Sequence, residues 1–287
     1  MIKIKRYWKV ETLEEAYELN QKRANRIIGG MVWMKMGEKQ FHTAIDLSDV
    51  VSSEIVENEE EFIIGAMTTL RDLECHEGIH KYTDGAVKES LRHIVGVQFR
   101  NVATVGGSIW GRFGFSDVLT MFLAMDTYVD LYKGGRVSLE AFSKMPYDKD
   151  ILLNIVVKKN TMSLAYESMR NTKTDFPVLA CAASVRPDEV LLSIGARPQK
   201  AVIIRANDTV MKIDRSEQEE FARALAVQVK AEISVGSNMR ASAEYRRQLA
   251  GVLARRAVMK ALVADEQKPM VITDTDTLQT KGGEQIC

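Results

Sequence analysis

Cysteine is scarce in this chain of 287 residues, and the three that occur, Cys75, Cys181 and Cys287, lie far apart. A disulfide framework, a zinc ribbon or an iron–sulfur cluster needs several cysteines at short spacings, usually with a Cys-x-x-Cys pair. The chain contains no such pair. The cysteines of this chain therefore cannot by themselves form any of these three kinds of site.

An excess of one charge is also missing, since 39 Lys and Arg residues balance 39 Asp and Glu residues. No broad basic field favours nucleic acid or an anionic membrane. No apolar run reaches the roughly 18 residues of a transmembrane helix. The charged N-terminus, Met1 to Arg6, has no apolar stretch behind it, as a secretory signal would have. We therefore expect a cytoplasmic protein that neither inserts into a membrane nor binds nucleic acid.

Strands and helices alternate in the first 160 residues. A helix starting at Leu13 lies between two apolar strands, and the pattern predicts a small βαβ-like unit that closes near residue 55. A second unit follows, with a glycine-rich stretch and an apolar helix that starts at Asp117. The strands expected in the first unit are at 2–10, 26–30 and 44–47.

From about residue 151 the pattern changes to closely spaced strands, which predicts an antiparallel meander. These strands are expected at 151–157, 164–169, 178–185 and 190–194. A long amphipathic helix from Ser242 to Val263 follows, with Val252 and Leu253 in its buried stripe and Arg246 mostly outside it. The polar residues 266–287 are expected to form a poorly ordered tail.

Two paired glycines are candidates for phosphate binding: Gly29-Gly30 and Gly106-Gly107, each beside an apolar segment. Without a Cβ, backbone amides can approach a phosphate and form an anion-binding nest. One such pair is ordinarily a structural turn. Two suggest loops that converge on a diphosphate. Neither is a Gly-x-Gly-x-x-Gly or P-loop motif, so a Rossmann fold or a P-loop is unsupported.

The stretch His76-Glu77-Gly78-Ile79-His80 matches the His-Glu-x-x-His motif of zinc hydrolases. That chemistry needs both histidines on one face of a rigid helix, and a third ligand. Gly78 is expected to interrupt the helix. A polar helix end is the better interpretation, and a zinc hydrolase remains a remote alternative.

Aromatic and basic residues gather at Trp110, Arg112, Phe113 and Phe115. Such residues stack on a flat heterocycle or gate it, and they also pack against partner chains. The residues themselves leave both interpretations open.

Several stretches together resemble the FAD-binding subunits of the molybdopterin dehydrogenase family, found in molybdenum hydroxylases of the xanthine and carbon monoxide dehydrogenase type. They occur in the expected order and span nearly the whole chain. They are Gly65-Ala-Met-Thr-Thr-Leu70, Gln98-Phe-Arg-Asn-Val-Ala-Thr-Val-Gly-Gly107, Gly195-Ala-Arg-Pro198 and Ser237-Asn-Met-Arg-Ala-Ser-Ala-Glu-Tyr-Arg-Arg247.

The resemblance implies an α+β fold. A two-lobed FAD-binding domain of the vanillyl-alcohol-oxidase-like (PCMH-type) class would occupy residues 1–160, with lobes at about 1–55 and 56–160. An antiparallel sheet with helices would occupy 161–265. The implied cofactor is FAD. A partner subunit with the molybdenum cofactor (molybdopterin) would oxidise the substrate, and a [2Fe–2S] subunit would pass electrons through FAD to NAD or another acceptor.

The resemblance also places the cofactor site. Backbone amides of the first and second loops would together hold the FAD diphosphate. In the second loop, the hydroxyl of Thr104 would be a further hydrogen-bond donor. Asp117 would accept a hydrogen bond from the cofactor. No catalytic side chain and no metal site is expected, because the flavin itself performs the redox chemistry. The first-loop residues are Ile28, Gly29, Gly30, Met31, Val32 and Trp33, and the second-loop residues are Ala103, Thr104, Gly106, Gly107 and Ser108.

Both loops depart from the family pattern. The first usually reads Gly-Gly-Thr-Asp-Leu, but here Met31, Val32 and Trp33 follow the glycines. The second usually continues with small residues and Ser-Pro, but here the segment 110–115 is bulky and basic. These changes leave one alternative open, a subunit of the same fold that has lost FAD and only organises the complex.

Overall fold

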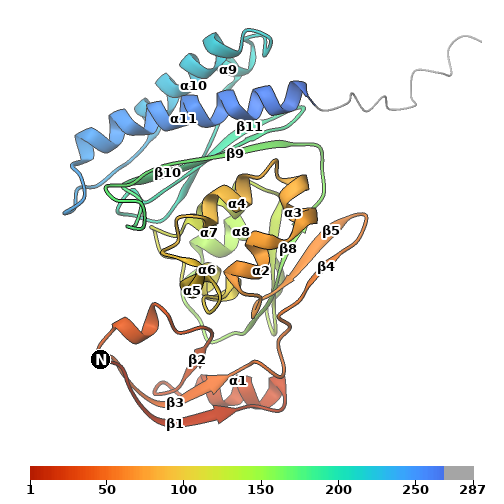
Figure 1. Ribbon diagram of the computed structural model, residues 1–287, viewed down its shortest axis with the longest axis vertical. Helices are drawn as coiled ribbons and strands as arrows, with labels where there is room; N and C mark the ends of the chain where they lie inside the picture. The colour runs from red at the N-terminus through yellow and green to blue at the C-terminus, as the bar shows by residue number, and fades with distance from the viewer. Residues whose placement is uncertain (268–287) are drawn as a thin grey trace, which may run out of the picture.

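The computed structural model describes residues 1–267, so nearly all of the tail expected at 266–287 lies outside the described residues. The strands form three sheets. Figure 1 shows a small N-terminal sheet at one end, a central body of short helices and a sheet, and a C-terminal sheet covered by long helices at the other end.

The N-terminal sheet is parallel, with strand order β1-β3-β2. Its strands are β1 (Lys3–Lys9), β2 (Arg26–Ile28) and β3 (Gln40–Asp46). Helix α1 (Leu13–Gln21) connects β1 to β2, and it begins at Thr12, whose side chain accepts a hydrogen bond from the Glu15 amide. The expected βαβ-like unit is confirmed. A 3-10 turn, η1 (Met34–Met36), lies between β2 and β3.

The central sheet is antiparallel, with strand order β4-β5-β8-β6-β7. Its strands are β4 (Ile55–Glu57), β5 (Glu61–Gly65), β6 (Thr127–Leu131), β7 (Gly135–Ser138) and β8 (Leu152–Lys158). The helices of this body are α2 (Leu70–Cys75), α3 (Glu77–Tyr82), α4 (Ala86–Leu91), α5 (Val97–Arg100), α6 (Val105–Trp110), α7 (Asp117–Phe122) and α8 (Leu139–Lys144).

Strand β8 corrects one prediction. The segment 151–157 was expected to begin the C-terminal meander, and this is wrong because β8 pairs with β5 and β6 in the central sheet. Its residues Ile155, Val156 and Val157 are all buried. A strand buried on both faces gives no alternating pattern, so its sequence does not reveal which strands flank it.

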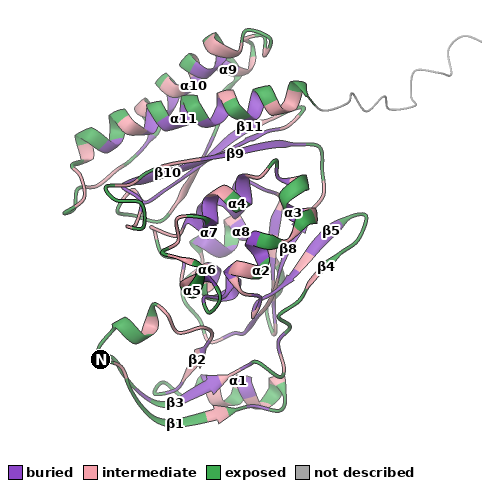
Figure 2. Cartoon of the chain, viewed as in Figure 1, coloured by how far each residue is buried: buried purple, intermediate pink, exposed green. Residues whose placement is uncertain are grey.

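The C-terminal sheet is an antiparallel meander in the order β12-β11-β10-β9. Its strands are β9 (Ser163–Met169), β10 (Leu179–Val185), β11 (Val190–Gly195) and β12 (Val202–Arg205), followed by α9 (Asp208–Met211), α10 (Gln218–Glu232) and α11 (Ala243–Glu266). The last three predicted strands are confirmed. Every residue of β10 and β11 is buried, because α11 covers one face while α7 of the central body meets the other (Figure 2).

Helix α11 is capped by Ser242, where the sequence predicted its start, and the predicted stripe is confirmed at Leu253 but wrong at Val252 and Arg246. Arg246 is fully buried and Val252 is 45% exposed. The stripe consists mainly of small residues that let the helix approach the sheet closely: Ala250, Leu253, Ala254, Ala257, Val258 and Ala261. Arg246 can be buried because its guanidinium donates to the carbonyls of Val178, Gly236 and Ala241 and to the side chain of Asn238.

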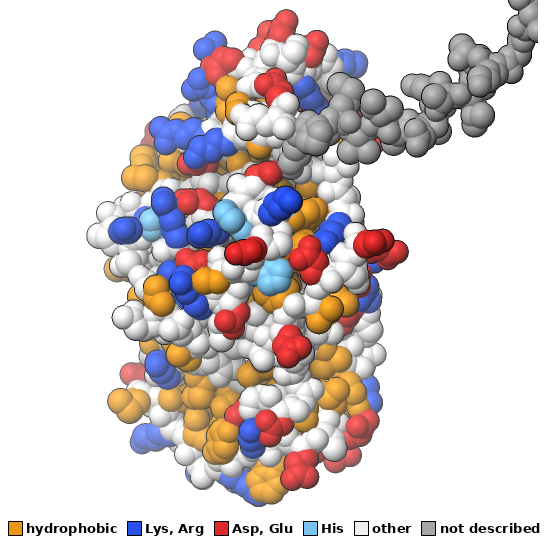
Figure 3. All heavy atoms as spheres, turned by 45° about the vertical axis from the view of Figure 1, so that its right-hand side comes forward, with side chains coloured by type: hydrophobic (Ala, Val, Ile, Leu, Met, Phe, Trp, Pro, Cys, Tyr) orange, Lys and Arg blue, Asp and Glu red, His pale blue; other side chains and the backbone are white. Residues whose placement is uncertain are grey.

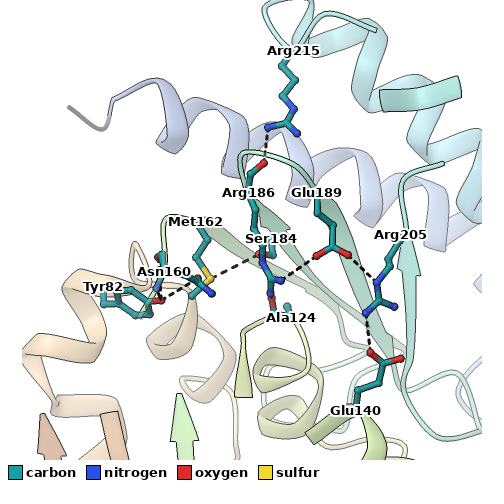
Figure 4. A network of polar contacts seen from close by, with 10 residues as sticks. All are labelled: Tyr82, Ala124, Glu140, Asn160, Met162, Ser184, Arg186, Glu189, Arg205 and Arg215. Carbon is teal, nitrogen blue, oxygen red and sulfur yellow. Dashed lines mark hydrogen bonds and ion pairs between the residues drawn. The ribbon is translucent and has the colours of Figure 1, made fainter. Parts of the chain in front are cut away.

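A polar network joins the central body to the C-terminal sheet, as Figure 4 shows. Arg186 donates to the Ala124 carbonyl and to Glu189, and Arg205 bridges Glu189 to Glu140 of α8 at 2.8 Å each. The hydrogen bond from Arg205, with a second from Lys144, lowers the pKa of Glu140 to about 2. The two parts of the chain are therefore held together by charge as well as by apolar packing.

Candidate flavin site

The two paired-glycine loops lie in direct contact. A Cβ atom on Gly29 would lie 2.7 Å from Oγ1 of Thr104, and one on Gly30 would lie 1.7 Å from the carbonyl oxygen of Val102. Side chains cannot fit at these distances, so the contact requires glycine. The two loops therefore lie together, as predicted, and their binding of a diphosphate stays a prediction.

The first loop, which follows β2, leaves its amides free. The backbone N–H groups of Gly30, Met31, Val32 and Trp33 donate no hydrogen bond within residues 1–267. The carbonyls of Met31 and Trp33 accept bonds from Lys35 and Met36, which close the turn η1. Met31 adopts a left-handed conformation with φ of 56°. Successive free amides in such a bend are suited to an anion such as a diphosphate.

In the second loop, which leads into α6, most of the backbone amides already donate hydrogen bonds to other groups of the protein. Those of Val105 and Gly106 donate to the carbonyls of Thr68 and Ala66, and that of Ser108 donates to the Thr104 carbonyl. The Gly107 amide donates to the Thr104 hydroxyl at 3.1 Å, which caps α6. Ala103 and Gly106 are buried, whereas Gly107 is exposed. That this loop holds the cofactor therefore stays a prediction, centred on Thr104 and Gly107.

Asp117, the first residue of α7, is buried behind the second loop. Its carboxylate accepts hydrogen bonds from Arg170, at 2.5 Å, and from the Tyr166 hydroxyl, both in the C-terminal part of the chain. Burial raises the pKa of Asp117, and the ion pair with Arg170 opposes that rise. These partners give Asp117 a role in the contact between the two parts. A hydrogen bond to the cofactor stays a prediction.

Four aromatic side chains, Trp33, Phe113, Phe115 and Phe176, form what is here called the aromatic cluster. The Trp33 ring centroid lies 4.9 Å from Phe115, 5.3 Å from Phe176 and 5.8 Å from Phe113. The rings of Phe113 and Phe115 are stacked at 5.2 Å. The cluster joins the first loop, the segment after the second loop and the C-terminal part. The sequence pattern did not reveal Phe176, which comes from a distant segment.

Arg112 and Trp110 do not belong to this cluster. Arg112 is buried, donates to the carbonyls of Met145 and Pro146, and lies 3.8 Å over the ring of Phe142. Trp110 also packs on Phe142. Trp110 and Arg112 therefore face the central body while Phe113 and Phe115 join the cluster, because the chain turns at Arg112, whose φ is 44°.

The zinc-type motif lies at the start of one short helix. Helix α2 ends at Cys75, and His76 caps α3 by accepting a hydrogen bond from the Ile79 amide. Gly78 lies inside α3, so the prediction that it interrupts the helix is wrong and the break falls at His76. Among the described residues, no three His, Cys, Asp or Glu side chains are placed to hold a metal.

Figure 3 shows acidic and basic side chains interspersed on the face that it presents, without a broad field of one charge there. Within residues 1–267, no helix is both long and apolar enough to cross a membrane.

Comparison with known proteins identifies both halves of the chain. Residues 2–159 match the FAD-binding domain in molybdopterin dehydrogenase, and residues 164–261 match the C-terminal domain of the carbon monoxide dehydrogenase flavoprotein. The uncharacterized protein YgfM of Escherichia coli K12 is 24% identical over 259 residues, which cover 87% of this chain and 93% of YgfM. A xanthine dehydrogenase of Emericella nidulans is 26% identical over 139 residues, which cover 44% of this chain and 10% of that enzyme.

Solved structures share the fold. The carbon monoxide dehydrogenase of Hydrogenophaga pseudoflava matches with a TM-score of 0.78 at 21% identity, covering 91% of this chain and 97% of the matched chain. The quinoline 2-oxidoreductase of Pseudomonas putida 86 matches with a TM-score of 0.78 at 19% identity, covering 92% and 98%. The α+β fold class that the resemblance implied is confirmed. Because the first match spans more than half of its residues, the chain belongs to the family of FAD-binding domains of molybdopterin dehydrogenases, whose cofactor is FAD.

Proposed function

We propose that this chain is the FAD-carrying electron-transfer subunit of a molybdenum hydroxylase. It receives electrons from [2Fe–2S] clusters of a partner subunit and passes them through FAD to NAD or another acceptor. The substrate is oxidised on a separate molybdenum subunit. The observation that carries the proposal is the run of free amides in the first loop, packed against the second loop in a chain of this family.

The chain's part in this reaction is to bind and orient the cofactor. FAD supplies the redox chemistry when it is bound. The amides of Gly30 to Trp33 would hold the diphosphate, and Thr104 would add its hydroxyl from the opposite loop. Charge-assisted hydrogen bonds of this kind are stronger than neutral ones. No acidic or basic side chain is required at this site.

The proposed partners follow from what the chain contains. Cys75 is exposed and Cys181 is fully buried, at separate places in the fold, so the iron–sulfur relay is assigned to another subunit. Another solved structure of similar fold is a Cu,Mo-containing carbon monoxide dehydrogenase, which supports a molybdenum subunit as the second partner.

Cofactor extraction tests this function. The chain is purified with the proteins that accompany it and denatured, and released FAD, iron and molybdenum are quantified. We expect about one FAD per chain, with iron and molybdenum only when partners are present. Anaerobic addition of NADH then tests the acceptor, because bleaching of the flavin absorbance supports NAD and an unchanged spectrum supports a different acceptor.

A second candidate is a structural subunit without flavin. It is favoured by one observation, the packing of Trp33 on three phenylalanine rings beside the loop that would hold FAD. An intact complex that contains iron and molybdenum but no flavin would decide for this candidate.

A further inference from the structure

We infer that the aromatic cluster and the pocket beside it are a stacking site for the isoalloxazine ring of the flavin, with Trp33 as its principal contact. The inference rests on the proposed function and deepens it. It assigns a positive role to Trp33, which departs from the family's usual first loop.

The pocket has the size and the walls of a small-molecule site. Its volume is about 330 Å³, and its lining includes Trp33, Phe115, Phe176 and Pro198. Small-molecule pockets of this kind are lined mainly by apolar and aromatic side chains, with a few polar groups that fix orientation. A flat heteroaromatic ring is the ligand chemistry that such walls favour.

Exposure distinguishes this cluster from ordinary core packing. Trp33 is 41% exposed and Phe113 is 37% exposed, although each contacts other rings of the cluster. By contrast, Phe62, Phe122, Phe142 and Phe221 of the cores are at most 1% exposed. Rings that only stabilised the fold would gain more by being buried. The open faces of the cluster therefore remain available for a ligand.

Two of the walls are held rigidly. Gly114, between Phe113 and Phe115, is docked on the C-terminal part, because a Cβ on it would lie 2.2 Å from the Gln199 carbonyl oxygen. Its own carbonyl accepts a hydrogen bond from the Ala196 amide. The wall that carries Phe176 is fixed through its neighbour Asp175.

Asp175 is held on both sides. Its carbonyl accepts from Arg170 at 2.7 Å, and its carboxylate pairs with Arg240 at 2.8 Å. A preorganised wall of this kind reduces the entropy lost when a ligand binds.

The pocket is polar at one edge. Asn238 and Arg240 line it there, and the Arg240 guanidinium carbon lies 5.2 Å from the Phe176 ring centroid. The side-chain oxygen of Asn238 is occupied by Arg246 and by the Arg240 amide, so its side-chain nitrogen is the group left to meet a ligand. An isoalloxazine ring has an apolar benzenoid edge and a polar pyrimidine edge, and the pocket matches that asymmetry.

The position along the chain agrees with the cofactor's layout. Trp33 closes the run of free amides that begins at Gly30, so a diphosphate on those amides lies next to the Trp33 ring. Trp33 also lines the pocket, so the pocket lies directly beside the first loop. Phe113 and Phe115 come from the segment that follows α6, the helix into which the second loop leads.

The test compares FAD with ADP, which has the diphosphate but no flavin ring. Affinities of both are measured by titration of the full-length chain and of its Trp33→Ala, Trp33→Phe and Trp8→Phe variants. Base–aromatic stacking gives an expected loss of about 10-fold in FAD affinity for Trp33→Ala. ADP affinity should be unchanged, Trp33→Phe should recover most of the loss, and Trp8→Phe on β1 should behave as wild type.

The outcomes separate the inference from the function on which it rests. Equal losses of FAD and ADP affinity in Trp33→Ala would show that Trp33 only supports the phosphate loop, and would overturn the inference. Unchanged FAD affinity in that variant would overturn it too, while leaving the function intact. A wild-type chain that binds neither ligand would remove the function and the inference together.

Discussion

The two glycine loops lie against each other but do different things with their backbones. The first leaves four successive amides, from Gly30 to Trp33, without a partner in the described chain, whereas the second donates those of residues 105–108 to its own surroundings. Positions 30 and 106 require glycine because neighbouring backbone lies too close for a side chain. A Cβ on Gly30 would lie 1.7 Å from the carbonyl oxygen of Val102, and one on Gly106 would lie 2.5 Å from that of Ala66. Gly107 is exposed, and its closest such contact is a side-chain atom at 3.0 Å.

This difference teaches that similar motifs need not have similar roles. In the first loop the glycines permit the close approach of the two loops, and the left-handed bend among the free amides is at Met31. In the second loop Gly106 packs against the backbone of Ala66, and Gly107 is exposed, where we predict that it leaves room for the cofactor. Substitutions should therefore separate effects on stability from effects on flavin binding.

The largest expected effect is that of Gly30→Ala. Its Cβ would overlap the Val102 carbonyl, so the loops must separate, at a cost of about 3 kcal/mol in the free energy of unfolding, as for overpacked sites. FAD should be lost as well. Thermal melts and flavin content check both, with Gly37→Ala as the matched control, since its nearest such contact is 3.3 Å away. A Gly30→Ala variant with the melting temperature of the wild type would show that the contact between the two loops does not require glycine at position 30.

Asp117→Asn should come next. It removes the charge partner of the buried Arg170 and should lower the free energy of unfolding by about 3 kcal/mol. FAD per folded chain reports separately on the predicted hydrogen bond to the cofactor: it should be retained if Asp117 serves only Arg170 and Tyr166. Denaturant melts and flavin content are measured together. Normal stability combined with lost flavin would instead assign Asp117 to the cofactor.

Gly107→Val should act on the flavin alone. The branched side chain projects from an exposed position and blocks the approach of the phosphate, so FAD retention should be abolished. The C-terminal half should stay folded, and the melting temperature should change little. Absorbance of the purified variant at flavin wavelengths checks this. Full flavin content would show that the second loop is not part of the site.

The smallest effect concerns the contact far from both loops, at Glu140. Its folded pKa of about 2 lies below the unfolded value of about 4.3, so the carboxylate stabilises the fold above pH 4.3 and loses that effect as the pH falls towards 2. Because its side chain is 33% exposed, Glu140→Gln should cost only about 1 kcal/mol at pH 7.

The pH dependence of that variant is the sharper observation. The difference in melting temperature between Glu140→Gln and wild type should be smaller at pH 3 than at pH 7. Glu59→Gln, at an exposed position, serves as the control. A difference that does not change with pH would mean that Glu140 stabilises the contact by packing and not by charge.

The sequence alone predicted the features that depend on short stretches. The βαβ unit and the capping of α11 by Ser242 each follow from local chemistry, and resemblance over several motifs supplied the fold class. The meeting of the two Gly-Gly loops is a long-range contact, inferred from the suitability of both for one diphosphate. What the sequence missed depends on distant partners. The sequence of strand β8 does not indicate that β5 and β6 are its neighbours. Phe176 joins the aromatic cluster only through tertiary contacts.

Arg246 shows the same limit in another form. A charged residue on a helix is ordinarily solvated, but here three carbonyls and Asn238 satisfy its guanidinium in the interior. The buried face of α11 is also hard to predict from the sequence, because its alanines are only weakly hydrophobic. Their small size nevertheless lets the helix pack closely on the sheet.

The most direct test of the central claim compares FAD with riboflavin, which carries the same ring without phosphates. If the amides of Gly30 to Trp33 hold the diphosphate, FAD should bind at least about 100-fold more tightly, as two charge-assisted hydrogen bonds would give. Titration of the flavin-stripped chain, followed by flavin fluorescence, measures both affinities. Equal affinities would contradict the account, because the ring alone would then supply the binding and the glycine loops would have no part in it.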